Sequence, residues 1–425
     1  MSETSLTATP SHRAWLLGAL IASFYPLLGL KRAFSLIGIG LTLYGVVVLI
    51  RRGRSLAGNP AMRAALMVAL AFALPLLLSL PDAAFPRVSL LATMSSLLYL
   101  PLMAGMIVLV QEQRIARPLY QVLVAVGVFW AADALLQLLL GHDLFGMPYN
   151  GERIGAYWQN QMKFGYYMGF LGLLVVAAQA VLQPQRPFLL AALWLWVAMG
   201  VLISGSREAW LMFFPLSGLL FWVHVAGRSR HRWLILGAGL ALAVAVALAA
   251  YELSPTVRGR LEQSLAGLHW DYAAIDKASS KRLDLWRIAV ELLRAHPVNG
   301  LGLDAYQLLF HELVRDPYWV AIKQSPYPHQ YLLEVGVATG VIGWLGLLAI
   351  VAVVARAWRR AAPEARVQAW PAVIYLAALW FPINTHRSFY SSELIMGNLL
   401  MLGLILGSLL PAKAPARAAP GAAGR

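Results

Sequence analysis

The residues best suited to chemistry in this chain are arginines and histidines that fall between apolar segments. The sequence SGSRE at positions 204–208 interrupts two apolar runs. Ser206 is placed to cap the following helix, whose free N–H groups and positive dipole end favour an anion. Arg207 adds a planar fork of donors that suits a phosphate. The interruption therefore predicts an anion site; the alternative is an arginine that reaches toward lipid headgroups from a helix end.

A second group of cations lies in KRLDLWRIAVELLR at positions 281–294. Its apolar residues recur at roughly helical spacing, which predicts an amphipathic helix: Leu283, Trp286, Ile288, Val290 and Leu293. His296-Pro297 and Asn299-Gly300 then form a helix-stop signal. Arg282 and Arg287 bracket Trp286 and are candidates for binding a phosphate. The alternative is a solvated basic stripe in which the arginines pair with Asp284 and Glu291.

A histidine falls where the longest polar loop returns to an apolar run, in PYPHQYLLE at positions 326–334. The neutral imidazole of His329 can accept a proton near neutral pH at such a boundary, although a lone histidine there can also act as a capping residue. Glu334 lies one turn further into the apolar run. An unpaired carboxylate there would be costly, so Glu334 needs a partner or a water-filled cavity.

Two further loops carry weaker candidates. Arg153 lies in GERIG at 151–155, and His386 and Arg387 lie in NTHR at 384–387, which a simple surface loop explains equally well. No GxxxxGK[ST] loop and no HExxH motif occurs, and cysteine is absent. The sequence therefore predicts no nucleotide hydrolysis and no metal site or other cofactor. Arginines can stabilise a diphosphate leaving group in place of Mg²⁺.

The composition sets the frame that must position these residues. Of the 425 residues, 60% are hydrophobic and 12% are charged, whereas a soluble domain has about 45–50% apolar and about 25% charged residues. The chain is therefore expected to be an all-α polytopic membrane protein, without nucleic acid as a partner despite a net charge of +15. About twelve spans are expected, at 14–30, 33–50, 64–80, 89–110, 118–140, 163–182, 187–203, 208–226, 233–251, 331–355, 368–383 and 393–411.

The distribution of arginine predicts sidedness. Arginines gather in alternate connections, at 51–63, 114–117, 228–232 and 356–366, so these and both termini are expected to be cytoplasmic. Residues 1–251 would form nine spans, 252–330 one long loop on the outer face, 331–411 three spans and 412–425 a disordered cytoplasmic tail. The long loop carries nine basic and nine acidic side chains. A loop of this length with its own helices is usually functional.

Taken in order, these motifs resemble the bacterial O-antigen ligase and polymerase family. The resemblance rests on the Ser-Gly-Ser-Arg turn, on Arg282-x3-Trp286 followed by HPxNGxG at 296–302, and on His329-x2-Leu332-x-Glu334 with Gly336, Gly340 and Gly343. Arg153-x-Gly155-x4-Asn160 is similar to the shorter upstream motif of the family. Two positions depart from its usual pattern, since Gln159 and Gln330 stand where Pro and Asn are commoner.

The resemblance implies an inverting, metal-independent glycosyltransferase of the GT-C type in the bacterial inner membrane, with its site facing the periplasm. Its donor would be a glycan on undecaprenyl diphosphate, and its acceptor the lipid A–core oligosaccharide. His329 would be the catalytic base. Arg207 and Arg282 would bind the donor diphosphate, with Arg287 and Arg153 as further candidates.

Three alternatives remain open at this point. A polymerase of the same family would use another lipid-linked repeat as acceptor, and a protein O-oligosaccharyltransferase would use Ser or Thr. From another class, twelve helices also suit a lipid-linked glycan transporter, but transporters usually place polar residues near the membrane midplane. In this chain the candidate residues gather on one face, which favours an enzyme.

Overall fold

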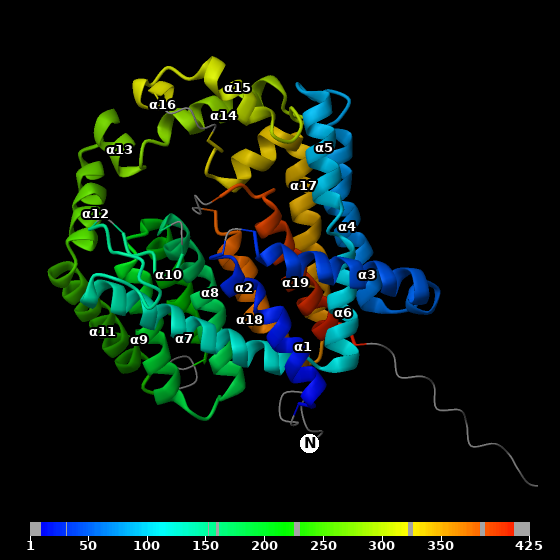
Figure 1. Cartoon of the computed structure of the whole chain (residues 1–425), viewed down its shortest axis with the longest axis horizontal. Helices are drawn as coiled ribbons and strands as arrows, with labels where there is room; N and C mark the ends of the chain where they lie inside the picture. The colour runs from blue at the N-terminus through cyan, green and yellow to red at the C-terminus, as the bar shows by residue number, and fades with distance from the viewer. Residues whose placement is uncertain are drawn as a thin grey trace, which may run out of the picture.

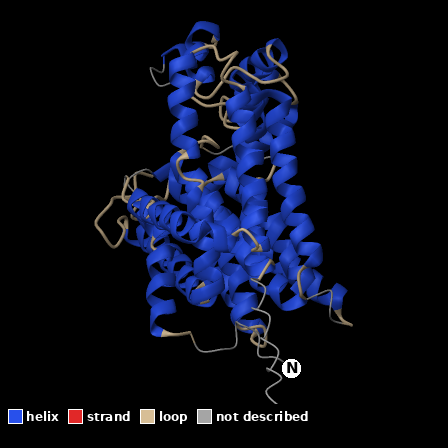
Figure 2. Ribbon diagram, turned by 90° about the vertical axis from the view of Figure 1, so that its right-hand side faces the viewer, coloured by secondary structure: helices blue, strands red, loops and turns tan. Residues whose placement is uncertain are grey.

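The computed structural model describes residues 10–30, 32–151, 153–158, 161–224, 230–321, 326–382 and 387–411. Helices dominate these residues, as Figure 2 shows. Those of the apolar bundle are α1 (His12–Ala22), α2 (Phe24–Leu27), α3 (Phe34–Leu56), α4 (Pro60–Leu78), α5 (Pro86–Leu97), α6 (Pro101–Gln113), α7 (Ala116–Leu140), α8 (Gln161–Leu182), α9 (Pro187–Ile203), α10 (Arg207–His224), α11 (Arg232–Leu253), α17 (Tyr331–Arg360), α18 (Pro363–Leu379) and α19 (Ser392–Leu409).

Each expected span overlaps at least one of these helices, and the all-α polytopic fold is confirmed. Among the described residues, eight helices are long and apolar enough to cross a membrane. The expectation of twelve spans stays a prediction. Three of the expected continuous spans are interrupted: the first breaks at Ser23, the fourth breaks before Pro101, and the tenth kinks at Gly340. Residues 412–425 lie outside the described residues, so the disordered tail also stays a prediction.

The bundle has a buried centre and an apolar outer surface. Almost every residue of α8 and α19 is buried, and these helices pack against α18. On the outside, large apolar side chains of α3, α4 and α17 stay exposed, including Leu36, Leu66 and Leu345. Exposed leucines on this scale are expected where the solvent is lipid, and they support a multi-pass membrane protein.

The long loop folds into a helical unit of its own, named the loop module (residues 255–321). It contains α12 (Pro255–Ala266), the 3-10 helix η2 (Gly267–His269), α13 (Tyr272–Ala278), α14 (Leu283–Ala295), α15 (Ala305–Leu313) and α16 (Pro317–Ala321). In Figure 1 these helices arch from α11 at the left edge across the top of the bundle toward α5 and α17.

Helix α14 confirms the expected amphipathic helix, but its buried face is offset from the predicted one. The fully buried residues are Leu285, Ile288 and Ala289, and Leu292 is partly buried behind them. Leu283 and Val290, which the apolar pattern placed on this face, lie at its margins. The face packs against α15 and the first turns of α17, so the loop module has a hydrophobic core separate from that of the bundle.

A backbone junction joins the loop module to α17. Gly340 has φ 61° and ψ −157°, which interrupts the helical hydrogen bonds. The segment 297–302 supplies the replacement partners: the N–H of Val341 donates to the carbonyl of Pro297 at 2.9 Å, and the N–H of Leu301 donates to the carbonyl of Val337 at 2.8 Å. Gly300, in the 296–302 motif, and Gly340, in the motif that begins at His329, are required because the two backbones meet there without room for a Cβ.

Candidate functional site

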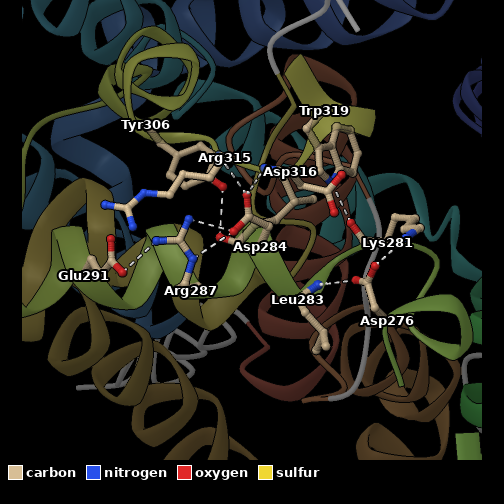
Figure 3. Close-up of polar contacts among 11 residues, drawn as sticks. Asp276, Lys281, Leu283, Asp284, Arg287, Glu291, Tyr306, Arg315, Asp316 and Trp319 are labelled. Atoms are coloured by element: carbon tan, nitrogen blue, oxygen red, sulfur yellow. Dashed lines mark hydrogen bonds and ion pairs between the residues drawn. The ribbon is translucent and has the colours of Figure 1, made fainter. Parts of the chain in front are cut away.

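Polar contacts fix the start of α14, which carries Arg282 (Figure 3). Lys281 forms an ion pair with Asp276 at 2.9 Å, and the N–H of Leu283 donates to the same carboxylate at 3.3 Å. The indole of Trp319 donates to the carbonyl of Lys281 at 2.7 Å. These contacts join α13 and α16 to the first turn of α14. Arg282, at the N-cap of that helix, is therefore held by three elements of the loop module.

Arg287 takes part in a different set of contacts on the same helix. It forms ion pairs with Asp284 at 2.6 Å and with Glu291 at 2.8 Å, and Figure 3 shows all three side chains together. The alternative of an intrahelical ion-pair stripe is confirmed for this arginine. Its charge is matched by two carboxylates, so the structure gives little support to the expectation that Arg287 binds the diphosphate.

Arg207 is the first residue of α10 and lies in the turn just outside the expected span 208–226. It reaches across to the loop module, where its guanidinium donates to the hydroxyl of Ser264 at 3.3 Å and to the hydroxyl of Ser280 at 2.6 Å. Ser280 and Lys281 both have positive φ values, of 63° and 65°. This tight left-handed turn brings Arg207 of the bundle close to Arg282 of the loop module.

Arg207 lies in a cluster of positive charge. Burial lowers its pKa to about 10. The charges that add to this shift are, in order, those of Arg260, Arg282 and Arg153. Burial also lowers the pKa of Arg282, and the carboxylate of Glu208 opposes that shift. The positive charges around Arg207 weaken its protonated form, and a bound anion would stabilise that form, so this arginine cluster (153, 207, 260 and 282) can hold a multivalent anion.

The placement of Arg153 follows from two polar residues inside α7. Asp133 accepts from the N–H groups of Leu144 and Tyr157, each at 2.9 Å. Gln137 accepts from the N–H of Gly155 at 2.9 Å. The loop between α7 and α8 is thus tied back onto the bundle on both sides of Arg153. Asp133, a carboxylate within an expected span, serves here as a structural anchor.

His329 is tied to the same helix as Arg282. The indole of Trp286, one turn after Arg282 on α14, donates to the carbonyl of Pro328 at 3.1 Å. His329 follows directly and has a φ of 51°. Strained backbone of this kind is concentrated at functional sites. The structure therefore places Arg282 and the segment that precedes His329 on one helix, α14.

Glu334 has the partners that its position required. Its carboxylate accepts from the hydroxyl of Ser388 and, at 2.9 Å, from the N–H of Phe389. Gln330 caps α17 through its side-chain oxygen, which accepts from the N–H of Leu333 at 2.6 Å, and its amide donates to the carbonyl of Pro382 at 3.0 Å. Glu334 and Gln330 thus join the start of α17 to the segments that flank the last loop.

The weaker candidates of the last loop have different outcomes. His386 lies outside the described residues. Arg387 pairs with the buried Glu393 at 2.6 Å, and Lys163 of α8 pairs with the same carboxylate at 3.1 Å. The structure thus places Arg387 in a three-membered network at the ends of α8 and α19.

Two cations near the site were missed from the sequence. Lys163 could have been found by the signal that selected Arg153, a cation at the outer end of an expected span. Arg260 carries no such signal, because it lies in a loop with balanced charge. In the described part of the chain, no group of three or more His, Asp and Glu side chains is placed to hold a metal ion. Independence from metal stays an expectation.

One comparison with known proteins found a match to a family model. The family model described as O-antigen ligase matches residues 190–348. The match begins in α9, includes Arg207, Arg282, His329 and Glu334, and ends within α17. It does not distinguish a ligase from a polymerase. No curated protein matches the chain.

Proposed function

We propose that the protein transfers a glycan from undecaprenyl diphosphate to lipid A–core oligosaccharide at the periplasmic face of the inner membrane, because residues 190–348 match the family model described as O-antigen ligase. The family implies a glycosyltransferase-like ligase or polymerase activity on lipid-linked glycans. The identity of the donor, the identity of the acceptor and the sidedness are the finer part of the proposal.

The observation that carries this proposal is the arginine cluster. Arg207 is held by two neutral hydroxyl groups and stands among three further arginines. A diphosphate is the multivalent anion that a lipid-linked glycan donor presents. Arginine forks form paired, charge-assisted hydrogen bonds with phosphate oxygens. In our proposal Arg207 and Arg282 hold the diphosphate, and Arg153 and Arg260 add positive charge around it.

His329 acts as the base in this proposal. The acceptor hydroxyl oxygen attacks the anomeric carbon while its proton passes to His329, and the bond between that carbon and the diphosphate oxygen breaks. The arginine cluster stabilises the negative charge that grows on the departing diphosphate. A single displacement of this kind inverts the anomeric configuration. The support for His329 is its link through Pro328 to Trp286, one turn from Arg282.

The acceptor divides the remaining candidates. A polymerase of the same family would transfer to another lipid-linked repeat, and a protein O-oligosaccharyltransferase to a Ser or Thr hydroxyl. A lipid-linked glycan transporter would bind the same donor without breaking a bond. The gathering of Arg207, Arg282 and His329 around the loop module favours a transferase over a transporter.

The test uses purified protein and glycan-diphospho-undecaprenol, offered separately with lipid A–core, with a second lipid-linked repeat and with an acceptor protein. We expect a shift in gel mobility only with lipid A–core. Transfer to either of the other acceptors would contradict the proposed acceptor class. Uptake of donor into vesicles without transfer would contradict the proposed enzyme and indicate a transporter.

Two residues of α12 give a matched pair of variants. Arg260→Gln removes a charge from the arginine cluster, whereas Arg258→Gln removes a charge that pairs with Glu252 at 3.2 Å. We expect a higher KM for the donor in Arg260→Gln and an unchanged KM in Arg258→Gln. His329→Ala should nearly abolish transfer while donor binding persists, since general-base catalysis is worth about 10²–10⁴-fold. Equal KM values for the two arginine variants would remove Arg260 from the site.

A further inference from the structure

A small cavity lies beside the segment that carries His329. It measures about 20 Å³, which is room for one water molecule or one hydroxyl group. Its wall is mostly apolar and includes Pro328, but three tyrosines (306, 327 and 390), the amide of Gln307 and the carboxylates of Asp304 and Glu334 also line it. Since Pro328 is bonded to Trp286 and precedes His329, the cavity adjoins the proposed base.

The two carboxylates of this cavity differ in what they already bind. Glu334 accepts hydrogen bonds from Ser388 and Phe389. Asp304 stands at the N-cap of α15 but does not cap it through its side chain. Among the described residues, the Asp304 carboxylate makes no hydrogen bond or ion pair. It is open to solvent on one side, while burial by neighbouring atoms raises its pKa.

Tyr327 lies close enough to this carboxylate for the charge of Asp304 to act on its phenol. The side chain of Gln307 hydrogen-bonds to Tyr327, the negative charges of Asp304 and Glu334 both act on its phenol, and the positive charge of Arg387 opposes them. The wall therefore offers a strong hydrogen-bond acceptor, Asp304, beside groups that can donate or accept. Asp304 also has a φ of 61°, so the carboxylate is presented from a left-handed turn.

We infer that this cavity binds a hydroxyl group of the acceptor sugar, through a hydrogen bond donated to Asp304, and that it selects an acceptor sugar that is uncharged at this position. The inference rests on the proposed function and assigns the acceptor side of the same site. A cavity of this volume admits one hydroxyl rather than a whole ring. A carboxylate or phosphate in that place would meet Asp304 and Glu334, while Arg387, whose charge acts on Tyr327, already pairs with Glu393, so acidic sugars are disfavoured.

The two sides of the site then carry opposite charge. The diphosphate of the donor meets the arginine cluster, and the uncharged acceptor meets Asp304. His329 adjoins the acceptor side, because the proton that it accepts comes from the acceptor hydroxyl. An acceptor hydroxyl anchored at Asp304 would fix the sugar ring and direct a second hydroxyl toward His329.

Asp304→Asn is the informative substitution, because asparagine keeps the shape and tolerates a left-handed backbone. We expect it to raise the KM for a saccharide acceptor that ends in a neutral hexose by roughly 10- to 100-fold, the loss of a charge-assisted hydrogen bond. The KM for the donor and kcat should change little. Glu312→Gln, an exposed carboxylate on the same helix, is the matched control and should leave every constant unchanged.

Acceptor analogues locate the hydroxyl. For the wild-type protein, one monodeoxy derivative of the terminal hexose should lose as much as Asp304→Asn loses, and the variant should not distinguish that derivative from the parent. The matching hexuronic acid should be a poor acceptor for the wild type and a better one, relative to the hexose, for Asp304→Asn.

The outcomes separate the two proposals. If the wild-type protein transfers glycan to no saccharide acceptor, the proposed function fails. If it does transfer, but Asp304→Asn keeps the wild-type KM and the wild-type preference for the neutral hexose, the acceptor cavity is refuted and glycan transfer stands.

Discussion

Replacing Gly340 by alanine tests the junction on which the site depends. The backbone there has φ 61° and ψ −157°, a conformation that is essentially restricted to glycine. A Cβ would stand 2.2 Å from the carbonyl oxygen of Val298. Because that oxygen belongs to backbone, the contact cannot be relieved by rotating a side chain. Either α17 straightens or the segment 297–302 leaves its place.

The cost can be worked from the contacts that would be lost. Holding a non-glycine residue in such a conformation costs about 1–3 kcal/mol. Displacing the segment breaks the hydrogen bonds from Val341 to Pro297 at 2.9 Å and from Ile342 to Val298 at 3.2 Å. At a net value of about 0.5–1.5 kcal/mol each, the total is roughly 2–6 kcal/mol. This is a large part of the roughly 5–15 kcal/mol that stabilises a typical folded protein.

The assay is thermal unfolding of purified protein in detergent, followed by tryptophan fluorescence, with limited proteolysis of the loop module in parallel. Gly218→Ala, in α10, is the control because nothing lies within 4 Å of the added Cβ. We expect Gly340→Ala to unfold at a clearly lower temperature and to be cut in the loop module, whereas Gly218→Ala behaves as wild type. A melting temperature of Gly340→Ala equal to that of the wild type would refute the claim that the backbone junction at Gly340 stabilises the protein.

Three further predictions follow from the sequence and the site. Transfer should persist in EDTA if, as we propose, the arginine cluster takes the place of a metal at the diphosphate; loss of activity that Mg²⁺ restores would contradict this. Asp304→Asn should melt at a higher temperature than wild type at pH 7 and at an equal temperature below about pH 4. The reason is that a carboxyl whose folded pKa is raised by burial loses stability as the pH rises from its unfolded pKa through its folded pKa, and asparagine removes this cost; a gap that does not close on acidification would count against it. In this cysteine-free chain, Leu268→Cys, exposed in η2, should react with an impermeant maleimide on spheroplasts; labelling only after lysis would reverse the expected sidedness.

The positions of the helices could be predicted because apolar runs and charged connections are local features. The interruptions were missed. Around Ser23 and before Pro101 the composition stays apolar, so no change of environment marks the break; Pro101, the first residue of α6, was the one local signal of it. At Gly340 the break depends on a segment about forty residues earlier in the chain, which supplies the missing hydrogen bonds. Such a pairing forms only in the folded chain, and in the sequence it is marked only by glycines at the two paired segments.

The candidate site divides in a similar way. Arg207, Arg282 and His329 could be singled out because their charge or chemistry stands near the ends of apolar runs, and their roles in one site stay a proposal. For Arg287 the spacing of its carboxylates already indicated ion pairs, and this alternative is the one confirmed. Arg260 was missed because its role depends on how α12 lies near Arg207, at the start of α10, whose guanidinium donates to Ser264 of α12. No local pattern encodes that placement.

Helix α14 positions residues for both parts of the proposed reaction, the binding of the donor diphosphate and the removal of the acceptor proton. Arg282 begins α14, and Trp286, one turn later, holds Pro328 and with it His329. One turn of helix rises about 5.4 Å, so helix geometry sets the spacing along α14 between Arg282, which would bind the donor, and Trp286, which holds the segment before His329. The core around Leu285 and Ile288 fixes α14 against α17, and the junction at Gly340 fixes α17 against the segment that follows α14. A change at that junction would therefore displace Arg282 and His329 together. Loss of transfer in Gly340→Ala should consequently affect donor affinity and turnover at once, whereas Arg260→Gln should affect donor affinity alone.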